Sequence, residues 1–117
     1  MPTAIKELFQ TIDLMDARGF AAAFTDEGRF RFGNAPTVVG RDAIEEAVSQ
    51  FFSQLTGLRH DILDVWNHGD VVISEVEVTY NRQDGESISL PAATIGRRNG
   101  TLFSDYRIYM DVNPLFE

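Results

Sequence analysis

The chain has 117 residues, no cysteine and a formal net charge of −8 at pH 7. This length predicts a single domain over residues 1–117, and the lack of cysteine excludes disulfides, thiolate nucleophiles and cysteine metal sites. The negative charge argues against nucleic acid and membrane surfaces as partners, because both are anionic. The first residues lack a signal-peptide pattern, and no window is apolar enough for a membrane helix. We therefore expect a cytoplasmic protein.

The first half of the chain is typical of helices. Apolar residues recur at three- and four-residue spacing over residues 4–15, which predicts an amphipathic helix. Asp16 precedes an alanine-rich run over residues 20–24 and suits the N-cap of a second, short helix. After Gly40, the apolar stripe over residues 44–55 is the clearest helix signal in the chain, and Gly57 is expected to end this helix. A short aromatic segment over residues 28–32 is the candidate first strand.

The second half of the chain has the period-two pattern of strands. Four β-branched and aromatic runs lie near residues 58–66, 70–80, 87–97 and 101–111. The pairs Asp84-Gly85 and Asn99-Gly100 between them are strong hairpin signals. Connections this short predict an antiparallel meander. The fold class is therefore α+β, with N-terminal helices packed on a curved antiparallel sheet to form a cone.

Two residues are candidates for chemistry inside such a cone. His60 lies at the start of a strand and shares a face with Ile62. If that face is the concave one, its imidazole lies in an apolar cavity, either as a boundary histidine with a backbone partner or as a catalytic base. Asp13 follows Phe9 by one turn, at the edge of the first helix's apolar stripe, where it either reaches water or enters the cone. Tyr80 and Tyr106 are further candidates.

Several other site types have no sequence signal. The chain contains no glycine-rich phosphate loop, no nucleophile elbow, and no His and carboxylate cluster with metal-ligand spacing. We therefore expect neither a metal nor a cofactor.

The order of elements resembles the superfamily of nuclear transport factor 2 and ketosteroid isomerase, and most closely its SnoaL-like branch. The resemblance covers nearly the whole chain and lies in six segments, which are Ile12 to Asp16 with Phe20, Phe24 to Gly28, Gly40 to Ile44, Arg59-His60, Gly69-Asp70 and Tyr106 to Asp111. It implies the cone fold and a homodimer formed by the outer face of the sheet. The fold hosts enzymes of several kinds as well as binding proteins, so function has to be transferred residue by residue.

Two activities of the superfamily lack their residues here. Ketosteroid isomerases use a helix tyrosine and two strand acids, and the matching positions here are Leu8, Phe32 and about Ala93. Limonene-epoxide hydrolases use an Asp-Arg-Asp set, and the matching positions are Val76, Val78 and Ile108. The resemblance therefore implies neither activity.

A third group matches better. Enzymes similar to scytalone dehydratase use an aspartate late in the first helix and a histidine on the strand after the long helix, and Asp13 and His60 fall at these positions. A second histidine of scytalone dehydratase would fall near Tyr80 or Asn81, and its asparagine near Ala92 or Ala93, so the match is incomplete. The resemblance implies an Asp13–His60 pair in the cavity.

The sequence hypothesis is a cofactor-independent lyase or isomerase of a small hydrophobic metabolite, with His60 as general base and Asp13 holding the imidazole. The alternative is a ligand-binding or dimerisation module without chemistry. The predicted pocket residues are Phe32, Val76, Tyr80, Tyr106 and Ile108.

Overall fold

The computed structural model describes residues 3–116, and side chains from Ile5 onward. The elements in chain order are α1 (Thr3–Asp13), α2 (Ala17–Ala22), β1 (Phe24–Phe32), β2 (Val38–Val39), α3 (Arg41–Phe52), β3 (Leu55–His68), β4 (Val71–Arg82), β5 (Ser87–Asn99), β6 (Leu102–Tyr109) and the 3₁₀ helix η1 (Asn113–Phe116). The predicted α+β class is confirmed.

The sheet is mixed rather than wholly antiparallel. Its strand order is β2-β1-β6-β5-β4-β3, and the meander from β3 to β6 is antiparallel as predicted. Gly85 and Gly100 have φ of +91° and +70° in two of its hairpin turns, where a side chain would be strained. However, β1 pairs in parallel with β6. The chain leaves β1, passes through α3 to the opposite edge of the sheet, and returns through the meander, so no hairpin constrains the direction of β1 against β6.

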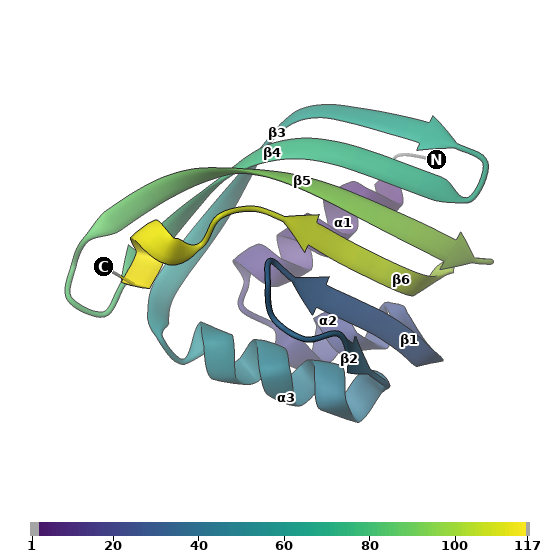
Figure 1. Ribbon diagram of the computed structural model, residues 1–117, viewed down its shortest axis with the longest axis horizontal. Coiled ribbons are helices and arrows are strands. Elements are labelled where there is room, and N and C mark those ends of the chain that lie inside the picture. Colours follow the sequence, from purple (N-terminus) through teal and green to yellow (C-terminus); the bar gives the residue numbers. More distant parts are fainter. Residues whose placement is uncertain (1–2, 117) are drawn as a thin grey trace.

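The α-helices α1, α2 and α3 lie on one face of the curved sheet (Figure 1). The apolar stripe of α1 is buried there, with Ile5, Leu8, Phe9 and Ile12 all less than a tenth exposed. No helix of the described residues is long and apolar enough to cross a membrane.

Local hydrogen bonds explain where the helices begin and end. Asp16 caps α2 as predicted, because its Oδ1 accepts from the backbone N–H of Gly19 at 2.9 Å. The predicted end of α3 at Gly57 is wrong, because the helix ends at Phe52 and Gly57 lies inside β3. The side chain of Gln83, in the β4–β5 turn, donates to the carbonyls of Ser53 and Leu55 at 3.1 and 3.3 Å. These bonds stabilise the short connection between the end of α3 and the start of β3.

Candidate active site

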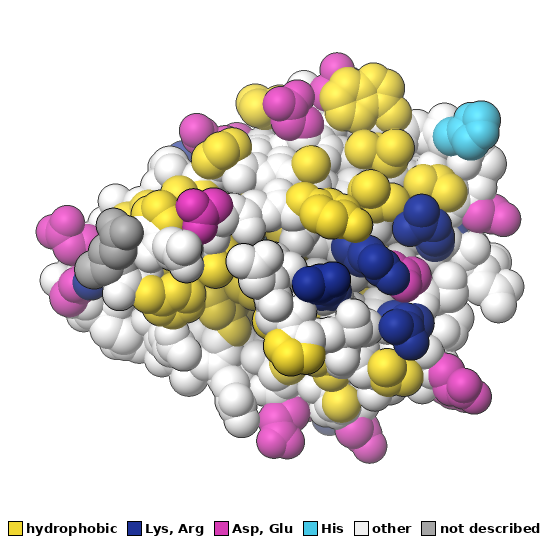
Figure 2. Space-filling model, in the orientation of Figure 1, with side chains coloured by type: hydrophobic (Ala, Val, Ile, Leu, Met, Phe, Trp, Pro, Cys, Tyr) yellow, Lys and Arg dark blue, Asp and Glu magenta, His cyan; other side chains and the backbone are white. Residues whose placement is uncertain are grey.

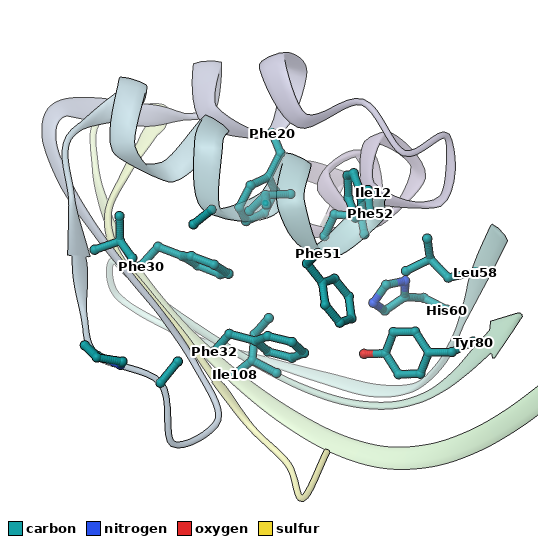
Figure 3. A pocket seen from close by; sticks show the side chains of 15 residues that line it. Ile12, Phe20, Phe30, Phe32, Phe51, Phe52, Leu58, His60, Tyr80 and Ile108 are labelled. Atoms are coloured by element: carbon teal, nitrogen blue, oxygen red, sulfur yellow. The ribbon is translucent and has the colours of Figure 1, made fainter. Parts of the chain in front are cut away.

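An apolar cavity lies between the helices and the concave face of the sheet (Figure 3). Its volume is about 160 Å³. Ala35 and Pro36, in the β1–β2 connection, are lining residues that are also exposed, so the cavity reaches solvent beside them. The full lining is Ile12, Phe20, Phe30, Phe32, Ala35, Pro36, Val38, Ala47, Val48, Phe51, Phe52, Leu58, His60, Tyr80 and Ile108.

The imidazole of His60 is bound to the carboxylate of Asp13. The Nδ1 atom of His60 lies 2.7 Å from Asp13 Oδ1, and the backbone N–H of His60 donates to Asp13 Oδ2 at 3.2 Å. The side chain of His60 is 8% exposed and that of Asp13 is 28% exposed. The two residues are 47 positions apart in sequence, so packing of α1 against β3 brings them together.

Helical spacing explains how one helix makes two contacts with one imidazole. Phe9 and Asp13 are four residues apart on α1 and therefore lie on the same side of the helix. The Phe9 ring stacks on the imidazole with a centroid distance of 4.6 Å and an interplanar angle of 18°. Phe9 thus packs against the face of the imidazole while Asp13 binds its edge, and together they determine the orientation of the ring.

The hydrogen bond to Asp13 determines the tautomer of His60. An ionised carboxylate only accepts hydrogen bonds, so the proton of the neutral imidazole is on Nδ1 and the lone pair is on Nε2. Burial lowers the pKa of His60 below 6.5, although the Asp13 hydrogen bond and the charges of Asp13 and Asp61 oppose this effect. At neutral pH the imidazole is therefore uncharged and able to accept a proton.

Tyr80 places a hydroxyl in the same cavity. It pairs with Leu58 across β3 and β4, one inward position from the pair of His60 and Val78. Its hydroxyl donates to Met110 Sδ at 3.5 Å, and a thioether is a weak acceptor that a ligand oxygen can replace. Burial raises the pKa of Tyr80, so the phenol keeps its proton at neutral pH.

Three of the five predicted pocket residues line this cavity, namely Phe32, Tyr80 and Ile108. Val76 is instead buried in the core, two positions along β4 from Val78, which pairs with His60. Its side chain is buried on the inner face of β4 but does not line the cavity.

Tyr106 is also part of the core rather than the cavity lining. It is fully buried, and four aromatic rings surround it at centroid distances between 5.5 and 6.4 Å, those of Phe20, Phe24, Phe30 and Phe103. These rings fill the space in which its phenol would have faced a ligand.

Sequence reasoning missed the contributions of α3 and of the β1–β2 connection to the cavity. Phe51 and Ala47 belong to the predicted apolar stripe of α3, which indicates burial but does not separate core residues from cavity-lining ones. Ala35 and Pro36 carry only the signal of a loop. Among the described residues no group of three or more His, Asp or Glu side chains is arranged to hold a metal ion.

Comparison with known proteins agrees with this architecture. The family model described as a SnoaL-like domain matches residues 5–105. A search of curated proteins finds no match.

Solved structures with low sequence identity have the same fold. A protein of ketosteroid isomerase-like fold from Catenulispora acidiphila, in complex with trimethylamine, is 16% identical with a TM-score of 0.86, and the match covers 93% of this chain and 85% of that one. A nuclear transport factor 2-like protein of unknown function from Burkholderia pseudomallei is 13% identical with a TM-score of 0.87, covering 97% and 92%. An LEH-like epoxide hydrolase of M. tuberculosis is 14% identical with a TM-score of 0.81, covering 97% and 84%.

Proposed function

This chain belongs to the SnoaL-like domain family, and we propose that it is a cofactor-independent lyase or isomerase in which His60 removes a proton from a small hydrophobic metabolite. The observation that carries the proposal is the 2.7 Å contact between His60 Nδ1 and Asp13 Oδ1 at the wall of the cavity. It leaves the basic Nε2 for the ligand. One structural neighbour, from Bacillus subtilis, carries the name putative isomerase, which is compatible with such chemistry on this fold.

Each polar group has a distinct role in the proposed reaction. Nε2 of His60 takes a proton from a carbon next to a carbonyl group, and the electron pair of the broken C–H bond moves toward the carbonyl oxygen. Asp13 stabilises the imidazolium that forms, and Tyr80 donates a hydrogen bond to the oxygen as its charge grows. His60 then returns the proton to another carbon in an isomerisation, or to a leaving group in an elimination. Phe32 and Ile108 shape the space around the ligand.

The second candidate is a ligand-binding module without chemistry. Among the described residues that line the cavity, His60 and Tyr80 are the only ones with polar side chains. An apolar cavity binds a hydrophobic ligand well, but it stabilises developing charge poorly. This candidate becomes the better one if ligands bind and no proton is transferred.

Exchange of carbon-bound protons separates the two candidates. We would follow deuterium incorporation next to the carbonyl of small cyclic ketones by NMR, with wild type and His60→Gln. A placed base contributes about 10²–10⁴-fold, so the variant should lose that factor. His68→Gln is the matched control, because His68 is exposed at the end of β3. Equal exchange rates in wild type and His60→Gln would refute the role of His60.

We also propose a homodimer formed by the outer face of the sheet. Outward residues of adjacent strands form an apolar row, in which Trp66 pairs with Ile73 and Ile73 with Ile95. Trp66 is 49% exposed, and Tyr109 on β6 is 51% exposed. Exposed aromatic residues of this kind are enriched at protein interfaces.

The charges on this face are unevenly distributed. Glu75 and Glu77 are exposed on β4, whereas Arg29 and Arg107 lie on β1 and β6, where Asp105 pairs with both and offsets only part of their charge. Figure 2 shows hydrophobic side chains across the visible face with Lys and Arg residues grouped beside them. A two-fold axis near the middle of the sheet would place the acidic half of one copy against the basic half of the other.

Light scattering at micromolar concentration tests the dimer. We expect a dimer for wild type and a shift toward monomer for Trp66→Ala. Leu14→Ala is the control, because Leu14 is 80% exposed and follows α1 rather than lying on the sheet. A monomeric wild type would refute the interface. Cytoplasmic location and the lack of a nucleic-acid partner stay predictions from the sequence.

A further inference from the structure

We infer that the cavity selects neutral molecules about the size of a single six-membered ring, and that Phe51 sets this limit. The inference rests on the proposed function, because it assigns the ligand to the same cavity. It adds a substrate class and a specificity-determining residue.

The volume of the cavity limits the size of the ligand. About 160 Å³ is available between the helices and the sheet. An engineered protein cavity of about 150 Å³ lined by aliphatic and aromatic side chains binds benzene. One six-membered ring with a carbonyl oxygen therefore fits, whereas two fused rings need more than this volume, so a second ring would have to extend past Phe51 or toward the opening beside Ala35 and Pro36.

The lining disfavours charged ligands. Its described residues include no Lys, Arg, Asp or Glu, so a carboxylate or phosphate would lose its hydration without gaining a counter-charge. Asp13 and Asp61, which act on His60 from outside the lining, add negative charge near the base and disfavour anions further. A cation would also lose its hydration, and among the described lining residues no carboxylate is present to pair with it.

Phe51 occupies the space that a second ring would need. It lies in the last turn of α3, and its ring contacts Phe32 of β1 edge-to-face at 5.0 Å and Tyr80 of β4 edge-to-face at 5.7 Å. Figure 3 shows Phe51 in the middle of the cavity, with His60 and Tyr80 on one side. Because Phe51 is only partly buried, its truncation should lengthen the cavity and leave most of the core intact.

Binding of three probes to wild type and Phe51→Ala tests this inference. The probes are cyclohexanone, 2-decalone, which has two fused rings, and cyclohexanecarboxylate. Their dissociation constants are measured from shifts of the His60 ring signals in NMR spectra. Wild type should bind cyclohexanone and bind 2-decalone about tenfold or more weakly, and Phe51→Ala should remove this difference. Neither wild type nor Phe51→Ala should bind cyclohexanecarboxylate.

Two further variants keep the test sound. Phe51→Leu should give a smaller gain for 2-decalone, and it replaces Phe51→Ala if that variant does not fold. Phe116→Ala is the matched control, because Phe116 is 58% exposed in η1, outside the cavity lining, and its removal should not change the ratio of affinities.

The outcomes distinguish this inference from the proposed reaction. Equal binding of 2-decalone to wild type and Phe51→Ala, tight binding of the carboxylate, or no probe binding at all would overturn the inference. Proton exchange on the same ketones is measured separately. Size selection without exchange refutes the proposed reaction and retains the inference, whereas exchange without size selection refutes the inference alone.

Discussion

Replacement of Asp13 by asparagine changes the candidate site with little change of shape. Asparagine retains an oxygen that can accept the hydrogen bond from His60 Nδ1, which in the wild type is 2.7 Å long. It removes the negative charge, and its amino group cannot accept the 3.2 Å hydrogen bond that the backbone N–H of His60 donates to Oδ2.

The geometry allows the cost of this substitution to be estimated. A hydrogen bond to a charged group contributes about 1.5–3 kcal/mol, against about 0.5–1.5 kcal/mol for a neutral one. Since the Asp13 side chain is 28% exposed, solvent screens part of the difference. We expect Asp13→Asn to lower the free energy of unfolding by about 1–2 kcal/mol near pH 8, where His60 is neutral.

The cost should grow on acidification. Asp13 raises the pKa of His60 against the larger effect of burial, so its loss lowers that pKa further. An imidazolium that forms in the variant lacks its counter-charge, and the difference in stability between the two proteins should widen as the pH falls below about 6.5.

Urea denaturation of both proteins near pH 8 and near pH 5.5 measures this effect. Asp61→Asn is the matched control, because Asp61 acts on His60 through its charge, whereas its described hydrogen bond is with Arg59. A loss for Asp13→Asn of less than about 0.5 kcal/mol, or one equal to that of Asp61→Asn at both pH values, would refute the reasoning.

Three further predictions concern His60, Tyr80 and the contact between α3 and β1. Burial lowers the pKa of His60, so its contribution to the stability of the wild type should be complete above pH 6.5 and should decrease as the pH falls below that value. The urea midpoint of the wild type should therefore fall with decreasing pH, and it should fall less in His60→Gln. Tyr80→Phe should leave the affinity for cyclohexanone within about threefold and slow proton exchange by about 10²-fold, since only the hydrogen bond to the growing oxygen charge is lost; an unchanged rate would exclude this role. Arg41 donates to the carbonyl of Phe24 at 2.8 Å and to Asp26 at 2.7 Å, so Arg41→Met should cost about 1–2 kcal/mol of unfolding free energy, more than Asp26→Asn does, by the same urea assay.

The meander could be predicted from the sequence because its signals are local. Asp84-Gly85 lies in one hairpin turn, and Gly100 lies in the next, directly after Asn99, which ends β5. Period-two patterns locate the strands that these turns connect. The pairing of β1 with β6 is not a local property. It depends on where the chain enters the sheet after two helices, and no turn residue encodes the direction of that entry.

The start of β1 shows how burial overrides propensity. The alanine-rich run ending in Phe24 favours a helix, yet β1 begins at Phe24. Phe24 is fully buried and packs edge-to-face against Phe20, so core packing determines where the strand begins.

The sequence indicates the positions of some residues of the candidate site better than those of others. Periodicity places Asp13 at the edge of a stripe and His60 on the same strand face as Ile62, without saying whether that face is concave, and the family resemblance implies that the two residues meet. Periodicity cannot distinguish Tyr80 from Tyr106, since both face inward, and only the three-dimensional packing places one in the cavity and encloses the other.

The pH titration of the His60 ring by NMR, in wild type and in Asp13→Asn, tests the central claim most directly. His68, which is exposed at the end of β3, provides an internal reference in both proteins. A buried imidazole coupled to Asp13 should titrate below His68 in wild type, and lower still in the variant. If His60 titrates together with His68 and does not respond to the substitution, the two residues do not form a functional pair, and the binding-module candidate replaces the enzyme.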